Sequence, residues 1–501
     1  MLSLETELEM YVEELYRNQD IGADSNQRDL MSKEAFEFLM RPVIDVIRDN
    51  KDASIDEIRG ILYKKSEIED VARSLIYDRC AAPGLMITYG TKQFRETLIA
   101  GENREVSLDA TGKIVDDMNP MLLDTIFDIA SITKLFTSIS ILKLEELGLI
   151  SLDDKVTKYV PGFRGIDGVT VFDLLTFQVP LKTKRIDQLS DYEEAKKALL
   201  DIQIDSNPNV ARPYSDMGAM VLKYVIENAS GQKYSDFLDY YVLKPLGVEG
   251  IYSSVKDNKK LLKRVAATGY DYRYGISASG TEELTMNKSV SQGDVYDAKA
   301  RMLSEDGLAG HAGLFATTDS MYKLGRALMN GSILKPSTVN SIAQNRTGRI
   351  LSTEGEGKIN YSQFLGSLVY SKHPVLNSSE VHHALSGSTI GMSGWTGMQL
   401  TIDPVNEVTS FLASNRSHNR VTSIDPLIAK NVLVDSRGRR LVKIEDGTEK
   451  IDSTGFVYQR DKLSHESLKL ALQYRFLERI EAIENNKMRA LSVGRYVSKN
   501  I

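Results

Sequence analysis

The sequence is poor in cysteine, in tryptophan and in long apolar runs. Its 501 residues include one cysteine, Cys80, and one tryptophan, Trp395. A single cysteine excludes a disulfide within the chain and is typical of a reducing compartment. Because free cysteines are usually buried, we expect Cys80 to be a small buried side chain. No apolar run approaches the roughly 20 residues that a membrane-spanning helix needs. The N-terminal segment is acidic and unlike a secretory signal, which predicts a cytoplasmic protein.

Neither sign of charge dominates the chain. It carries 62 Lys and Arg against 69 Asp and Glu, a net charge of -7, and the two signs are mixed along the sequence. A protein that binds nucleic acid needs a basic surface for the phosphate backbone, so we expect no nucleic-acid partner and no membrane partner. The motifs Gly-Xaa-Ser-Xaa-Gly, His-Glu-Xaa-Xaa-His and the phosphate-binding glycine-lysine loop are absent as well. Their absence argues against an α/β-hydrolase, a zinc protease and a nucleotide hydrolase, and we predict neither metal nor cofactor.

The chain is longer than one hydrophobic core usually supports, which predicts a main body with added segments. Near the N-terminus, apolar residues recur at three- and four-residue spacing and predict helices that pack on the body or join copies into a homo-oligomer. Strand patterns in 81–101 and 382–416 flank a mostly helical stretch. This order predicts an α+β body whose sheet is completed by distant segments. The predicted divisions are a helical extension (1–62), a core (63–420) with a helical subdomain at about 130–330, and a C-terminal segment with a closing helix (421–501).

Ser131 and Lys134 are the first candidate catalytic pair. They are three residues apart in a predicted helix, so both side chains lie on one face with Cβ atoms about 5–6 Å apart. A serine hydroxyl is a weak nucleophile near neutral pH and needs a proton acceptor beside it. Burial disfavours the charged form of a lysine, so Lys134 could lose its proton and act as the base.

The same spacing occurs in two other pairs, Ser140 with Lys143 and Ser253 with Lys256. Spacing alone is therefore a weak signal. Ser131 differs from Ser140 because it opens its helix, where free N–H groups can stabilise an oxyanion. Ser140 lies well inside the same helix, and we expect its hydroxyl to bond back to the preceding turn.

Several segments in a fixed order carry a resemblance to a known family. They are FDIASITKLFTSISILKLEELGLISLDDKVTKYVP, PYSDMGAMVLKYVIENASGQKYSDFLDYYVLKPLGV, GDVYDAKA, GLAGHAGLFATTDSMYKLGRALMNG and GMSGWTGMQLTIDPVNEVTSFLASNR. Over about residues 65–420 the chain resembles the serine β-lactamase-like and penicillin-binding-protein family, which includes class C β-lactamases, DD-peptidases and esterases. The resemblance implies an antiparallel sheet flanked by helices together with an all-helical subdomain.

The resemblance also implies a role for individual residues. Tyr214 stands at the tyrosine of the second motif and would relay a proton between Ser131 and the leaving group, a step that a nearby lysine ammonium favours. The backbone N–H groups of Ser131 and Trp395 would form the oxyanion hole. Met392, Ser393 and Gly394 stand at the third motif, and with Asp216 they would contact the substrate.

Two positions depart from the family pattern. Met392 replaces the lysine or histidine of the third motif, and a thioether offers no charge to a substrate carboxylate, so efficient β-lactam hydrolysis is not expected. Asp216 replaces the usual asparagine, so it either holds Lys134 or favours a cationic substrate. His311 is interpreted as a packing residue of its loop.

The function predicted from the sequence is that of a serine hydrolase that works through an acyl-enzyme on a small ester or D-residue peptide. Two alternatives stay open. One is an acyltransferase or cyclase that passes the acyl group to an amine. The other is a non-catalytic binding protein that kept the fold after its third motif changed at Met392.

Overall fold

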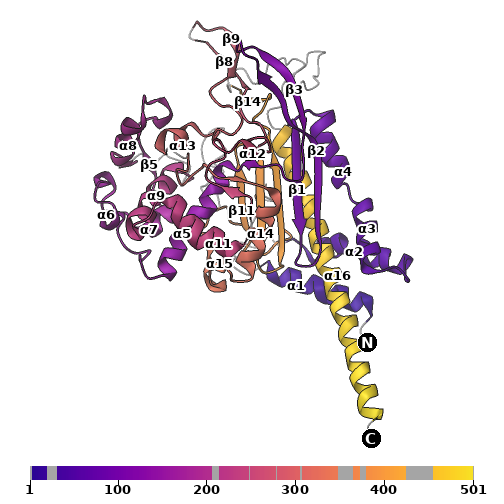
Figure 1. Cartoon of the computed structure of the whole chain (residues 1–501). Coiled ribbons are helices and arrows are strands. Elements are labelled where there is room, and N and C mark those ends of the chain that lie inside the picture. The colour runs from indigo at the N-terminus through magenta and orange to yellow at the C-terminus, as the bar shows by residue number, and fades with distance from the viewer. Residues whose placement is uncertain are drawn as a thin grey trace, which may run out of the picture.

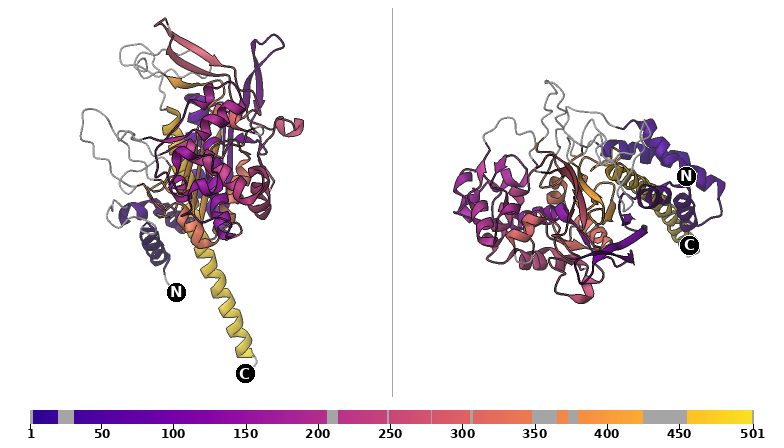
Figure 2. Two further views of the ribbon diagram at one scale, coloured as in Figure 1. Left: turned by 90° about the vertical axis from the view of Figure 1, so that its left-hand side faces the viewer. Right: turned by 90° about the horizontal axis from the view of Figure 1, so that it is seen from above.

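The computed structural model describes residues 3–19, 31–205, 214–247, 249–277, 279–304, 307–347, 365–372, 380–424 and 455–499. Within these residues a six-stranded sheet divides the molecule into two packed layers of helices (Figures 1 and 2). The predicted α+β class, with an antiparallel sheet and flanking helices, is confirmed.

The central sheet joins both ends of the core, as the strand patterns predicted. Its order is β11-β12-β13-β1-β2-β3 and every neighbouring pair is antiparallel. In β1, Ile87 lies opposite Leu98 on one side and Leu412 on the other. All of β1 is buried because helices cover both faces of the sheet. The strands are β1 (Gly84–Gly90), β2 (Arg95–Leu108), β3 (Ile114–Pro120), β11 (Ile390–Gly394), β12 (Met398–Asp403) and β13 (Val408–Ser414).

One face of the sheet carries the main core, to which Met86 of β1 contributes. Its helix α5 is buried from Thr133 to Leu142, including the polar side chains of that stretch. The helices of this part are α5 (Thr133–Glu146), α6 (Val156–Tyr159), α7 (Val171–Leu175), α8 (Tyr192–Leu200), α9 (Asp216–Ser230), α10 (Tyr234–Leu238), α11 (Lys244–Leu246), α12 (Lys259–Leu262), α13 (Ala298–Leu303), α14 (Thr318–Met329) and α15 (Pro336–Ile342).

Short strands connect and cap this helical part. β8 (Asp271–Ile276) and β9 (Glu282–Asn287) form a hairpin, and β14 (Val421–Ile424) pairs with β8 in parallel. Figure 1 places this hairpin at the top of the molecule, beside β3. The remaining two-residue strands are β4 (Phe127–Asp128), β5 (Leu181–Lys182), β6 (Gln203–Ile204), β7 (Ile251–Tyr252) and β10 (Phe315–Ala316).

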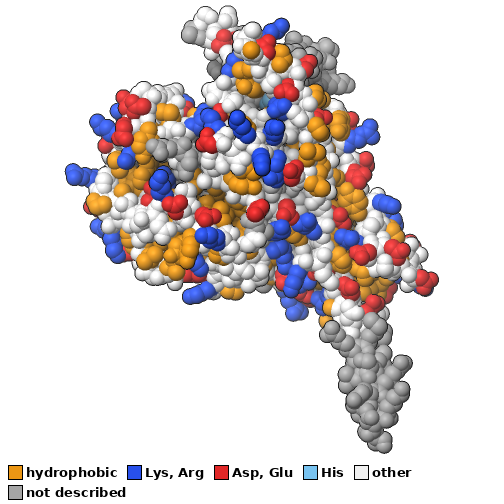
Figure 3. Space-filling view, in the orientation of Figure 1, with side chains coloured by type: hydrophobic (Ala, Val, Ile, Leu, Met, Phe, Trp, Pro, Cys, Tyr) orange, Lys and Arg blue, Asp and Glu red, His pale blue; other side chains and the backbone are white. Residues whose placement is uncertain are grey.

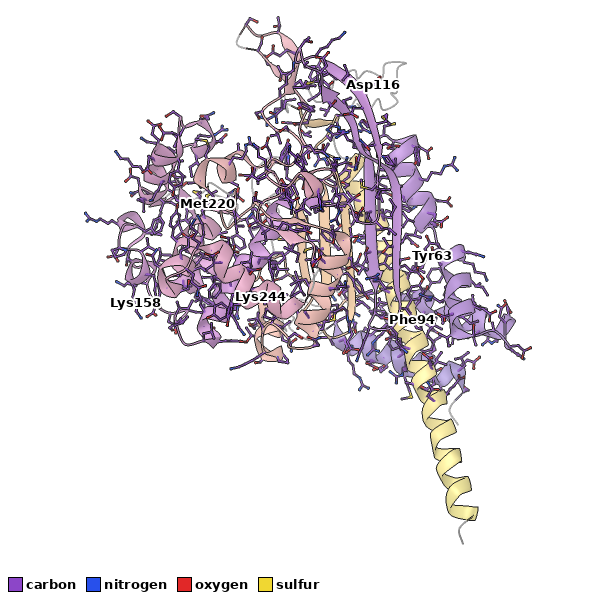
Figure 4. The ribbon with its side chains drawn as sticks, viewed as in Figure 1. Tyr63, Phe94, Asp116, Lys158, Met220 and Lys244 are labelled. Carbon is purple, nitrogen blue, oxygen red and sulfur yellow. The ribbon has the colours of Figure 1, made fainter. Side chains whose placement is uncertain are left out.

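The opposite face of the sheet carries a second core, made with the N-terminal helices and the C-terminal helix. Leu85, Ile87 and Tyr89 of β1 point into it, because alternate residues of a strand face opposite sides. Figure 4 shows Tyr63 and Phe94 on this side and Met220 on the other. The helices are α1 (Leu4–Asn18), α2 (Lys33–Asp49), α3 (Ile55–Lys65), α4 (Ile68–Arg73) and α16 (Gly455–Lys499), whose C-terminal end projects beyond the body in Figure 1.

Serine caps explain where the N-terminal helices begin. Ser3, Ser32 and Ser54 each precede a helix, and each hydroxyl accepts a hydrogen bond from a backbone N–H of the first turn. Ser54 also forms a capping box with Glu57. The helices predicted within 1–62 are thus present, and they share one hydrophobic core with α16 and the sheet.

Two expectations on single features can be compared with the structure. Cys80 is exposed, so its prediction as a buried side chain was wrong. The residue stands at the turn before β1 with φ +43°; its carbonyl accepts a 2.7 Å hydrogen bond from Arg420, and its thiol donates to the carbonyl of Tyr77 at 3.6 Å. As for membranes, no described helix combines the length and the apolarity that a span requires.

Candidate active site

Ser131 lies on a tight turn at the start of α5. Residues 130–132 form a single turn of 3-10 helix before α5 proper begins at Thr133, so Ser131 lies on this turn just ahead of the helix that it was expected to open. Ala130 adopts a positive φ of +45°, which is unusual for a residue with a side chain. The buried carboxylate of Asp128 accepts the N–H of Ala130 at 2.8 Å and holds the turn in this conformation.

Lys134 lies one turn further along and points at the serine. Its Nζ donates a 2.9 Å hydrogen bond to Oγ of Ser131 and a 3.3 Å bond to the carbonyl of His311. The competing pair on the same helix is arranged differently. Ser140 donates back to the carbonyl of Phe136 at 2.8 Å, as predicted, and Lys143 donates to the carbonyl of Ile333.

The second motif is positioned by the N-terminus of α9. Ser215 caps this helix by accepting the N–H of Met217 at 3.1 Å, which fixes Tyr214 just before the helix and Asp216 at its first position. The ring of Tyr214 is stacked between Phe177 and Tyr370, with centroids 5.3 and 5.8 Å away. Nζ of Lys134 lies 5.0 Å from the centroid of the Tyr214 ring.

Lys134 is completely buried and pairs with Asp216. Its Nζ lies 2.8 Å from Oδ1 of the carboxylate. Burial acts to lower the pKa of Lys134, but the charge and the hydrogen bond of Asp216, together with Tyr214, outweigh it and raise the pKa above its ordinary value. The contact with Asp216 therefore opposes the loss of the proton that burial alone would favour. Of the two roles considered for Asp216, the structure shows the one that holds Lys134.

A second lysine and a histidine extend this charged network. Lys299 contacts Asp216 and lies 3.9 Å from Asp297, whose carboxylate is 2.9 Å from Nε2 of His311. Burial would raise the pKa of both carboxyl groups, but the neighbouring cations hold both below their usual range. Asp216, Asp297 and His311 lie close enough to share a metal ion. Both carboxylates already contact an ammonium group, so the lysines supply the positive charge that a metal would bring.

The third motif lies on β11, directly beside the nucleophile turn. A side chain at Gly394 would lie 2.7 Å from the carbonyl of Ile129, so only glycine allows the strand to approach this closely. Thr396 donates a 2.7 Å hydrogen bond to the carbonyl of Asp128 and ties the next turn to the same place. Met392 is fully buried in the main core, because its position on β11 points away from the cleft.

These elements surround a cleft of about 1180 Å³. Six of the predicted site residues line it: Ser131, Tyr214, Asp216, Ser393, Gly394 and Trp395. Lys134 lies beneath the surface and Met392 lies outside the lining. Sequence reasoning missed Tyr370, Lys299, Asp297 and Arg416, which also line the cleft. The segment GDVYDAKA contains Asp297 and Lys299, and the last of the resembling segments ends at Arg416, but neither segment marked these residues as part of the site; Tyr370 lies outside all of these segments.

The arrangement can bring a serine hydroxyl, a lysine ammonium and a phenol to one carbonyl group of a ligand. Backbone N–H groups at the start of a helix have no partner inside it, so the turn at Ser131 offers donors to a developing oxyanion. Trp395, with 54 % of its surface exposed, follows the end of β11 and lines the same cleft.

Comparison with known proteins gives a family and a set of relatives. A family model described as Beta-lactamase matches residues 98–432. A protein of Salmonella gallinarum provisionally named D-alanyl-D-alanine carboxypeptidase is 29% identical over 339 residues, which cover 62% of this chain and 73% of the relative. A protein of Escherichia coli K12 with the same provisional name is 27% identical over 332 residues, 59% of this chain and 70% of the relative.

Solved structures share the fold at lower identity. A simvastatin synthase mutant from Aspergillus terreus matches with a TM-score of 0.54 and 15% identity, over 81% of this chain and 94% of that one. EstCE1, described as a hydrolase with promiscuous acyltransferase activity, matches with a TM-score of 0.51 and 19% identity, over 71% and 94%. At these identities the two structures support the fold alone.

Proposed function

Because this chain belongs to the beta-lactamase family, we propose that it is a serine hydrolase that cleaves an ester or amide through an acyl-enzyme on Ser131. The observation that carries the proposal is the 2.9 Å hydrogen bond from Lys134 to Oγ of Ser131 on the wall of a large cleft. The Ser140 pair has the same spacing and lacks this arrangement, so spacing alone does not produce it.

The first step is attack of Oγ of Ser131 on the substrate carbonyl. Tyr214 takes the serine proton and passes its own proton to the leaving group as the new acyl–oxygen bond forms and the old bond breaks. Lys134 stays protonated because Asp216 raises its pKa, and its charge stabilises negative charge that develops on the serine and tyrosine oxygens. The N–H groups of Ser131 and Trp395 receive the oxyanion. Water then releases the acyl group by the reverse path.

The stacked rings give Tyr214 its fixed position. Phe177 and Tyr370 hold the phenol from both sides, so its orientation depends little on the ligand. Such fixed geometry is what proton transfer over a hydrogen-bond distance requires.

Substitution of Ser131 tests the proposal. Ser131→Ala should abolish turnover of a neutral ester such as p-nitrophenyl butyrate while circular dichroism and the melting temperature stay those of the native protein. Ser140→Ala is the matched control on the same helix and should keep its turnover. Hydrolysis that survives in Ser131→Ala contradicts the assignment.

Covalent labelling gives a second test of Ser131 that does not depend on the choice of substrate. A fluorophosphonate probe should add to Ser131, and mass spectrometry of the digested protein should find the label on the peptide that contains SITK. Labelling at another serine would contradict the assignment of Ser131 as the nucleophile, and no labelling at all would favour a non-catalytic binding protein. The relatives' names make a peptide ending in D-alanyl-D-alanine the first amide to compare with the ester.

A further inference from the structure

The cleft carries an excess of positive charge in a chain that is negative overall. Eight of its lining side chains are Lys or Arg and four are Asp or Glu, whereas the whole chain has a net charge of -7. Over the face of the molecule shown in Figure 3, basic and acidic side chains are interspersed. The excess in the cleft therefore differs from the general character of the sequence.

Several of these cations are already neutralised by neighbours. Arg185 lies 2.7 Å from Asp187, and Arg460 lies 2.8 Å from Asp461. Lys299 belongs to the network around Asp216. By contrast, Arg416 has no ion pair and no side-chain hydrogen bond within the described part of the chain.

Arg416 is held in place by two aromatic rings. Its guanidinium carbon lies 5.5 Å from the centroid of Trp395 and 5.1 Å from that of Phe456 at the start of α16. These contacts fix the plane of the guanidinium and leave its N–H groups free to bind a ligand. Trp395 also supplies one of the proposed oxyanion donors, so Arg416 lies close to the place where the reacting carbonyl would sit.

Another arginine of this chain shows what a purely structural arginine between rings looks like. The guanidinium carbon of Arg59 lies 5.1 Å from the Phe94 ring and 6.0 Å from the Tyr474 ring, outside the cleft. Arg59 lies 3.1 Å from Asp56 and 3.0 Å from Glu96, so its charge is neutralised by two carboxylates. Arg416 has the same aromatic setting without the carboxylate.

We propose that Arg416 binds a carboxylate of the substrate, so that the cleft takes an ester or amide that also carries a negative charge. This inference rests on the proposed hydrolase function and names the substrate class of that site. Met392 is buried in the main core and brings no charge to the cleft, whereas Arg416, on the turn after β13, lines it. A guanidinium binds a carboxylate through two parallel hydrogen bonds, which a single ammonium cannot do.

The electrostatic surroundings of Arg416 favour an anion. Burial, together with repulsion from Arg460, lowers the pKa of Arg416 to about 10, and the more distant Tyr296 and Asp271 oppose this only in part. The guanidinium remains charged at neutral pH. A bound carboxylate would neutralise this charge and so offset both its burial and its repulsion from Arg460.

The test compares acids with their neutral counterparts. We would measure kcat/KM for 3-acetoxybenzoate against its methyl ester, with the charge on the leaving group, and for mono-p-nitrophenyl glutarate against p-nitrophenyl butyrate, with the charge on the acyl group. In the native protein at least one acid should be preferred over its neutral counterpart. Arg416→Gln should reduce that preference about 10- to 100-fold, the loss expected for a charge-assisted hydrogen bond.

Two further variants separate charge from packing. Arg416→Lys keeps a positive charge and should recover part of the preference, while Arg59→Gln removes the other ring-bound arginine and should leave the preference unchanged. If neither acid is preferred, or if Arg59→Gln reduces the preference as much as Arg416→Gln does, Arg416 does not bind a substrate carboxylate.

Binding measurements on an inactive variant distinguish a failure of the carboxylate proposal for Arg416 from a failure of the proposed hydrolase function. In the Ser131→Ala background, calorimetry should show that 3-acetoxybenzoate or mono-p-nitrophenyl glutarate binds more tightly than its neutral counterpart, and Arg416→Gln should remove the difference. Binding of this kind in a protein whose native form hydrolyses neither the esters nor a peptide ending in D-alanyl-D-alanine would leave the inference standing and overturn the hydrolase. Hydrolysis of neutral esters without any preference for acids would leave the hydrolase function standing and overturn the carboxylate proposal for Arg416.

Discussion

Lys134 and Phe36 are both fully buried, one on each side of the same sheet, and their surroundings differ completely. Lys134 lies among Asp216, Tyr214 and the turn of Ser131, so the helices on its side enclose a charged network and a cleft. Phe36 belongs to the second core, which the N-terminal helices and α16 fill with apolar side chains. The comparison shows that the residues proposed for catalysis lie on one face of the sheet, whereas the second core reaches the cleft only through the start of α16.

Removal of Lys134 should have the largest effect on the first side. Lys134→Met eliminates the cation beside the serine and tyrosine oxygens, and kcat/KM for a neutral ester should fall about 10²- to 10⁴-fold. Lys143→Met is the matched control, because Lys143 has the same spacing from a serine on the same helix but lies outside the cleft. A Lys134→Met protein that keeps more than a tenth of the native kcat/KM would show that the buried ammonium takes no part in the reaction.

The contact between Ser131 and Lys134 could be predicted because the two residues are close together in the sequence. Ser131 and Lys134 share one helix face, and the Tyr214 motif caps the next long helix, so local spacing and known motifs were enough. The charge state of Lys134 could not be predicted, because it depends on a 2.8 Å contact with Asp216, which is distant in the sequence. Arg416 ends one of the resembling segments, but nothing in that segment marked it as a residue of the cleft.

Prediction of the fold was limited in the same way, by contacts between segments that are distant in the sequence. Strand and helix patterns predicted the α+β class and the two distant halves of the sheet. They did not show that the N-terminal helices and α16 would form one core, since apolar periodicity says which face is buried but not which partner covers it. Cys80 shows the same limit at one residue, because its exposure follows from a turn that composition does not reveal.

A cavity in the second core should change stability without changing the chemistry. Phe36→Ala removes a fully buried ring from α2 and should lower the free energy of unfolding by about 3–5 kcal/mol, measured by urea denaturation. Its kcat for a neutral ester, measured well below the melting temperature, should stay close to the native value. Phe136→Ala makes the equivalent cavity on α5, beside Lys134, and should lower both quantities. An equal loss of kcat in both variants would show that the two faces are coupled.

The smallest effect concerns two buried aspartates, one from each part of the molecule. Burial raises the pKa of Asp128, beneath the nucleophile turn, and of Asp461 on α16 to about 6. A carboxyl group with a raised folded-state pKa stabilises the protein fully below its unfolded pKa of about 4, and this contribution is lost as the pH rises through 6. Each group should therefore make the protein up to about 3 kcal/mol less stable at pH 7 than at pH 4.

Substitution by asparagine removes this pH dependence and separates the two sites by activity. For each variant, we subtract its free energy of unfolding from that of the native protein at the same pH, so that the other titrating groups cancel. This difference should change between pH 4 and pH 7 by a similar amount for Asp128→Asn and for Asp461→Asn. Asp128 accepts the N–H of Ala130 and, at 2.7 Å, that of Tyr296, whereas an asparagine offers one oxygen for the two donors. Asp128→Asn should thus loosen the turn of Ser131 and lower kcat for a neutral ester about tenfold, and Asp461→Asn should not. Equal kcat values for the two variants would mean that the turn keeps its strained conformation without the carboxylate, and that Asp128 contributes to stability alone.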